Sequence, residues 1–122
     1  MDVSREEGLL AWQWSLYPVG HRDRGNLLVH ALTAPLLPIG CCALVAALIL
    51  GSRWLAIAGV IGVVLPVILQ ARGHRREAQA PAPFRGPLDV VVRLFVEQWV
   101  TFPRYVLSGG FARAWRSSAQ PH

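Results

Sequence analysis

Apolar residues gather in two long runs near the middle of the chain. Residues 27–50 and residues 54–69 contain no Asp, Glu, Lys or Arg, and the short segment 51–53 separates them. At about 1.5 Å per residue, the first run is long enough to cross the roughly 30 Å apolar core of a bilayer. The second run is short for a full span, but it can extend through Ala71. The pattern therefore predicts a transmembrane hairpin with helices at 27–50 and 54–71.

Two amphipathic segments flank this hairpin. Ser4 and Glu7 fit a capping box, and the tryptophans that follow suit a membrane–water interface, so a short interfacial helix is predicted at 5–16. A third helix is predicted at 87–107, after a polar stretch rich in Pro, Gly and Arg. Residues 108–122 are expected to form a tail. The sequence thus predicts an all-α fold and a single membrane domain over residues 1–122.

The predicted helix at 87–107 carries one narrow polar stripe on a broad apolar surface. The stripe has polar residues at every fourth position: Asp89, Arg93, Glu97 and Thr101. We expect the stripe to face water or lipid headgroups. The apolar surface is then expected to lie in the interface or to pack on the hairpin.

Composition and charge agree with a membrane protein. Apolar residues make up 53% of the chain and charged residues 16%, well below the roughly 25% of soluble domains. All twelve basic residues are arginine, the net charge is +5, and the arginines flank the apolar runs without forming a stripe. Membrane lipids, and not nucleic acid, are therefore the expected partners. The sequence gives no indication of oligomeric state.

The arginines also predict the orientation of the hairpin. Five of them flank its open end: Arg22, Arg24, Arg72, Arg75 and Arg76. The turn carries only Arg53. By the positive-inside rule both termini are expected in the cytoplasm, with the protein in the bacterial inner membrane.

Three histidines lie at matching places on the two arms. His30 comes 21 residues before Gly51, and His74 comes 21 residues after Arg53, so antiparallel helices put both imidazoles at one depth. His21 precedes the first arm on the same side. Glu77 shares a helical face with His74, and Asn26 shares one with His30.

Three imidazoles and a carboxylate suit a divalent transition metal such as iron or zinc. Other interpretations of these residues remain open. His30 can instead hydrogen-bond a neighbouring helix, and His74 can belong to a basic cluster that faces lipid phosphates. Haem binding by His30 and His74 is a further alternative.

Two sequence elements resemble a known family of small membrane enzymes. Residues 17–30 have the spacing YxxxHxxxxNxxxH, and residues 70–74 have the spacing QxxGH. Together they resemble the 2-hydroxy-fatty-acid dioxygenases of fatty-acid α-oxidation, and the segment 97–110 resembles short bacterial members. Glu77 comes three positions after His74, one fewer than the family's acidic residue. Larger members also have more membrane helices between the two elements.

The resemblance implies an Fe(II)-dependent membrane oxidoreductase that uses O₂ to shorten a 2-hydroxy fatty acid by one carbon. It implies that His21, His30 and His74 ligate iron with Glu77 as the carboxylate. Tyr17, Asn26 and Gln70 are then expected to support the ligands. The substrate carboxylate is expected to meet one of three basic residues: Arg72, Arg75 or Arg76. A competing prediction is a holin-like or accessory membrane protein without enzymatic activity, which needs no convergence of histidines.

Overall fold

The computed structural model describes residues 4–118, and the regular structure in this part of the chain is all helical, without a strand. In chain order the elements are η1 (Arg5–Glu7), α1 (Leu9–Leu16), α2 (Arg24–Thr33), α3 (Leu36–Leu50), α4 (Arg53–His74), α5 (Pro87–Val96), η2 (Glu97–Thr101), α6 (Phe102–Leu107) and α7 (Gly110–Ser118). The predicted helical class is confirmed. The tail predicted at 108–122 is a helix as far as Ser118, and residues 119–122 lie outside the described part.

A long hairpin forms the stalk of the molecule. Helices α3 and α4 run side by side from a tight turn at Gly51, whose φ of 64° is left-handed, and the Ser52 side chain caps α4. Counted together, α2 and α3 are long and apolar enough to cross a membrane, and so is α4. This confirms two predicted apolar helical segments, with different bounds. The first begins at Arg24 and is interrupted at Ala34 and Pro35 between α2 and α3, and the second continues past residue 71 to His74.

The two arms of the stalk approach closely because both present glycine. A Cβ added to Gly40 would lie 2.8 Å from the backbone carbon of Gly62 and 3.0 Å from the carbonyl oxygen of Gly59. Small residues at a crossing allow helix backbones to come into contact, as in many membrane helix pairs. Large apolar side chains elsewhere on the stalk remain exposed, with Leu48 86% and Ile49 77% exposed.

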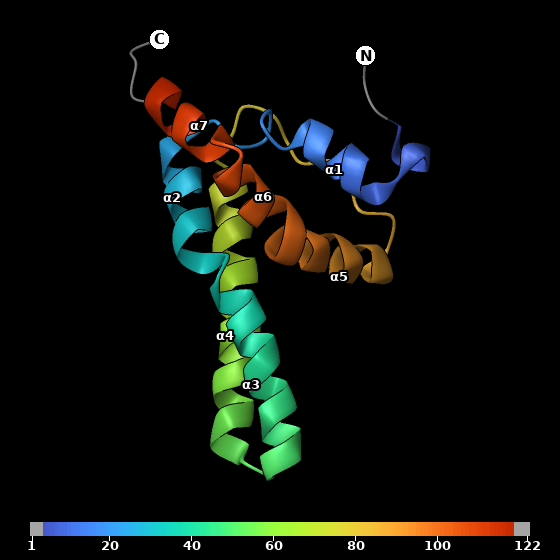
Figure 1. The fold of residues 1–122 in the computed structure, drawn as a ribbon, viewed down its shortest axis with the longest axis vertical. Helices are drawn as coiled ribbons and strands as arrows, with labels where there is room; N and C mark the ends of the chain where they lie inside the picture. The colour runs from blue at the N-terminus through green and yellow to red at the C-terminus, as the bar shows by residue number, and fades with distance from the viewer. Residues whose placement is uncertain (1–3, 119–122) are drawn as a thin grey trace.

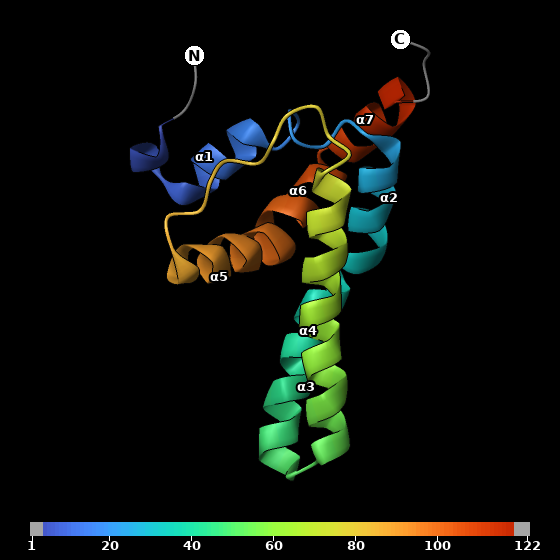
Figure 2. The same ribbon diagram turned by 180° about the vertical axis from the view of Figure 1, so that it is seen from behind.

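A second layer lies across the end of the stalk that is remote from the turn. In both views α5 and α1 run across the axis of the hairpin, with α5 nearer the turn and α1 on its far side (Figures 1 and 2). Gln13 of α1 donates to the carbonyl of Arg93 at 3.0 Å, and Arg5 pairs with Asp89. The predicted helix at 5–16 is divided, because Gly8 with φ 125° separates η1 from α1.

The polar stripe of α5 points inward, so the expectation that it faces water or headgroups is wrong. Arg93 is only 9% exposed and Thr101 only 2%. The apolar side of the helix faces outward, with Leu88 75% and Val91 61% exposed. The stripe turns inward because its charges find partners there: Asp89 pairs with Arg5 of η1, and Arg93 donates to carbonyls of the segment before α5.

The helix that begins at Pro87 contains one widened turn. Residues 97–101 form the π-helix η2, in which the N–H of Phe102 bonds to the carbonyl of Glu97, five residues earlier. Pro103 has no N–H, so an α-helical bond to the carbonyl of Trp99 cannot form there. The extra residue in this turn brings Glu97, Gln98, Thr101 and Phe102 onto the inner side together.

Candidate metal centre

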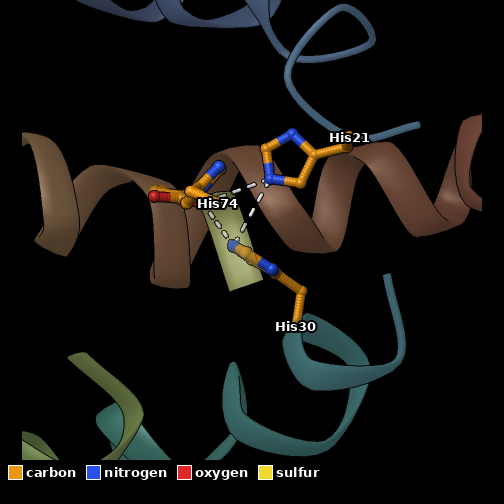
Figure 3. Close-up of side chains that lie close together, drawn as sticks. His21, His30 and His74 are labelled. Carbon is orange, nitrogen blue, oxygen red and sulfur yellow. Dashed lines mark hydrogen bonds and ion pairs between the residues drawn. The ribbon is translucent and has the colours of Figure 1, made fainter. Parts of the chain in front are cut away.

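Four side chains from four separate segments converge where the second layer meets the stalk. Each of His21, His30, His74 and Glu97 offers one ligand atom, and these atoms all lie within 4.8 Å of one another. The Nε2 atoms of His21 and His30 are 3.3 Å apart, and His30 Nε2 is 3.4 Å from a carboxylate oxygen of Glu97. Figure 3 shows the three imidazoles directed toward one another. This group could hold a metal ion.

Local structure places each of the four residues. His21 lies in the loop before α2, two residues ahead of its N-cap Asp23, and His30 lies on α2 itself. His74 is the last residue of α4, and Glu97 is the first residue of η2. The equal spacing of His30 and His74 about the turn thus brings them together, as the sequence predicts.

Backbone carbonyls fix the orientation of two imidazoles. His21 Nδ1 lies 2.8 Å from the carbonyl oxygen of Tyr17, and His30 Nδ1 lies 3.0 Å from that of Asn26. A carbonyl can only accept, so each Nδ1 carries the proton and each Nε2 presents a lone pair to the centre of the group. Metal-bound histidines commonly have this arrangement.

The protonation states also suit a cation. Burial, followed by the neighbouring His30, lowers the pKa of His21 to about 3, so its imidazole is neutral at pH 7. Neutral imidazoles beside a carboxylate are the forms that bind metal.

Tyr17 supports both a ligand histidine and the carboxylate. Its ring stacks on His21 with centroids 3.8 Å apart, and its hydroxyl donates to Glu97 Oε1 at 3.2 Å. Burial and the adjacent Glu97 raise the pKa of Tyr17 well above its ordinary value, so the phenol keeps its proton. The other predicted supporting residues, Asn26 and Gln70, are also buried nearby.

Glu77, the carboxylate predicted from sequence, has a different place. It accepts hydrogen bonds from the backbone N–H groups of Arg22 and Asp23 and from Asn26 Nδ2, the last at 2.7 Å. It therefore holds the loop that carries His21, while Glu97 stands beside the imidazoles. Sequence analysis missed Glu97 because the fourfold spacing of the stripe resembles a solvated helix face. The signal in the sequence was Pro103, because a proline here prevents a regular α-helical bond and accompanies the π-helical turn that contains Glu97.

The QxxGH element has a packing role beneath the histidines. A Cβ added to Gly73 would lie 2.4 Å from Asn26 Oδ1, so only glycine allows α4 to approach α2 this closely. Gln70 and Gln98 each donate a side-chain hydrogen bond to the other, at 3.0 and 2.8 Å, and Gln70 also donates to Thr33. These buried amides are satisfied as a pair and tie α4 to η2.

Only one of the three arginines expected to meet a substrate lines a cavity. A cavity of about 540 Å³ lies between α1, α4, α5 and residues 75–86, and Arg75 contributes to its wall along with His21, His74 and Glu97. Arg76 is paired with Asp23 at 2.8 Å. Arg72 is exposed and is not part of this wall.

The chain was compared with protein-family models, with curated proteins and with solved structures, and none of them matches it.

Proposed function

We propose that the four-residue cluster binds ferrous iron and that the protein is a membrane-bound, iron-dependent dioxygenase. The observation that carries this proposal is the convergence of three imidazoles and one carboxylate, with the Nε2 lone pairs of His21 and His30 directed inward. The buried Nδ1 of His74 has no hydrogen-bond partner among the described residues, which also fits a site that receives a cation. Imidazole and carboxylate ligands suit non-haem iron, and iron rather than zinc follows from the YxxxHxxxxNxxxH and QxxGH resemblance.

The proposed reaction is the oxidative one-carbon shortening of a 2-hydroxy fatty acid: the C1–C2 bond breaks, O₂ is reduced, and the products are the shorter fatty acid, CO₂ and water. Iron bound here would supply the activation of O₂ that no side chain provides. The protein's own residues hold the ligands in place: Tyr17 orients Glu97, Asn26 fixes His30, and Glu77 secures the loop of His21. The cavity gives a substrate headgroup access to three of the four ligands.

We further propose that the stalk spans the membrane with the metal centre on the cytoplasmic side. The exposed apolar side chains of α3 and α4 need a hydrocarbon environment, and the flanking arginines favour cytoplasmic termini. Helix α5 would then lie in the plane of the membrane. Its apolar side chains, such as Leu88 and Val91, are exposed, and α5 lies nearer the turn of the stalk than α1 does (Figure 1), so we place this apolar side in the bilayer.

Two alternatives are less well supported. A holin-like or accessory protein needs no convergence of three histidines. Haem is also disfavoured, because two axial histidines bind from opposite sides of the macrocycle through bonds of about 2 Å. Their rings must therefore lie farther apart than the histidine rings of this cluster. The rings of His30 and His74 have centroids only 4.9 Å apart, and His21 lies 4.6 Å from His30 by the same measure.

The test is metal content and turnover of the purified protein. Protein in lipid nanodiscs, loaded anaerobically with Fe(II), is expected to retain about one iron and to convert 2-hydroxyhexadecanoic acid to pentadecanoic acid when O₂ is admitted. His30→Ala should lose most of the iron and the activity, whereas His122→Ala should lose neither. If His30→Ala retains full iron content, the site is wrong. If iron binds normally but the hydroxy acid is not consumed, the reaction is wrong.

A further inference from the structure

The cavity beside the metal centre has the composition of a site for an amphiphile. Its polar end is formed by His21, His74 and Glu97. The rest of the wall is mainly apolar, with Gln13, Gln70 and Glu77 among its polar members, and includes Trp12, Leu16, Val67, Ala71, Phe84 and Leu94. Its volume of about 540 Å³ is within the range of about 300–1,000 Å³ usual for small-molecule sites. A ligand that fills it needs a polar head at one end and an apolar body.

Two cations contribute to this cavity, and their surroundings differ. The guanidinium of Arg93 donates to the carbonyls of Ala82 and Pro83 and lies 3.7 Å from Asp89, so its position is fixed and its charge already has a partner. Arg75 is exposed, and its side chain has no ion pair or hydrogen bond with the described residues. It directly follows His74, which places it next to the metal ligands. Arg75 is therefore the cation available to an incoming anion.

We propose that this cavity binds one acyl chain within the protein, with the carboxylate between Arg75 and the metal centre. A water molecule occupies about 30 Å³ in the liquid. If each non-hydrogen atom of a ligand needs a similar space, the cavity holds on the order of twenty such atoms, about as many as one long-chain fatty acid contains. The chain lies against the apolar wall between α1 and α5, and does not remain in the bilayer. This assignment rests on the proposed function, and it makes Arg75, and not Arg72 or Arg76, the residue that positions the substrate.

Photo-crosslinking tests where the chain lies, independently of turnover. The protein in nanodiscs is irradiated with a 2-hydroxyhexadecanoic acid that carries a diazirine at mid-chain, and the cross-linked peptides are identified by mass spectrometry. We expect cross-links on the peptides of α1, residues 78–84 and α5. Cross-links confined to the exposed faces of α3 and α4 would place the chain in the bilayer and overturn the proposal.

Two substitutions with matched controls sharpen the test. Ala71→Phe fills the cavity and should reduce the cavity cross-links several-fold, whereas Ala58→Phe, exposed on the same helix outside the cavity, should not. Arg75→Gln should also reduce them several-fold, and Arg72→Gln should not. Unchanged cross-linking in both Ala71→Phe and Arg75→Gln would contradict the assignment. Equal labelling of the cavity by a diazirine phospholipid would show that the ligand is a two-chain lipid and not a single fatty acid. Iron content is measured on every sample, so loss of iron binding in the unmodified protein is recognised as failure of the proposed function.

Discussion

At the scale of single residues, Glu97 and Glu77 have different roles, and their positions in the sequence do not show which role each has. Glu97 stands among the imidazoles, and Glu77 accepts N–H groups from the loop that carries His21. Both carboxylates lie near the same centre, and a change in either would lower activity. The effects on metal affinity and on protein stability, however, should separate them.

We expect Glu97→Gln to weaken Fe(II) affinity at least tenfold, because the amide removes the one anionic ligand of the cluster. Glu77→Gln should leave iron affinity within about threefold but lower the stability of the metal-free protein by about 1–3 kcal/mol, through weakened charge-assisted hydrogen bonds. Competition with a coloured chelator measures the first quantity, and thermal unfolding in detergent measures the second. A larger loss of iron affinity for Glu77→Gln than for Glu97→Gln would show that Glu77 is the ligand.

The lowered pKa of His21 makes the stability of the metal-free protein depend on pH. An unfolded chain protonates this imidazole near its ordinary pKa of 6.5, whereas the folded protein does so only near 3. As pH falls through this interval, the unfolded state binds the additional proton, so stability decreases. We expect the melting temperature of iron-free protein to fall from pH 7.5 to pH 5.0, and to fall less in His21→Asn. Equal slopes for the two proteins would show that His21 does not carry the effect.

At the scale of helices, α5 shows how an amphipathic pattern can be assigned to the wrong side. The fourfold spacing predicts the helix and its stripe, and the range 87–107 agrees with α5, η2 and α6. Which side faces the protein depends on partners that are distant in the chain, such as Gln13 and Arg5, and periodicity does not contain that information. In a membrane the apolar side can face outward, so the usual inference from a soluble helix fails.

This orientation predicts which of two substitutions, one on α5 and one on η2, lowers the stability of the protein more. Arg93→Ala should destabilise the protein by about 1–3 kcal/mol, because it leaves the carbonyls of Ala82 and Pro83 without their donor and removes a charge beside Asp89. Trp99→Ala should cost less than about 1 kcal/mol in detergent, because 42% of that side chain is exposed. Thermal unfolding of both variants provides the comparison. A larger loss of stability for Trp99→Ala than for Arg93→Ala would mean that the polar stripe faces solvent.

At the scale of the whole molecule, the histidine positions were predictable and the carboxylate was not. Equal distances from the turn set the depth of His30 and His74, which requires only helix geometry and a hairpin. Glu97 comes from a segment that returns to the stalk through the long loop 75–86, and neither helix periodicity nor loop length fixes where such a segment docks. The two apolar helices were the easiest part to predict because composition alone marks them.

Single cysteines can test the proposed placement in the membrane. In a Cys41→Ala, Cys42→Ala background, an impermeant maleimide should label Arg53→Cys in intact bacterial cells and Ala112→Cys only in inverted vesicles. Val91→Cys, on the outer side of α5, should react in neither until detergent is added, because it lies in hydrocarbon. Rapid labelling of Val91→Cys in inverted vesicles would place α5 in water, and labelling of Ala112→Cys in intact cells would reverse the topology.

The widened turn η2 has a consequence for how this chain can vary over generations. One residue more than an α-helical turn requires rotates everything that follows by about 100°, the angle between successive residues of a helix. Loss of a single codon in this turn would restore regular winding and swing Phe102 and Tyr105 away from His30 and Tyr17, which they now contact. Gain or loss of one residue is ordinarily harmless in a loop and is decisive here. Descendants of this gene are therefore expected to keep the length of the segment from Glu97 to Pro103 more strictly than the identity of its outward side chains.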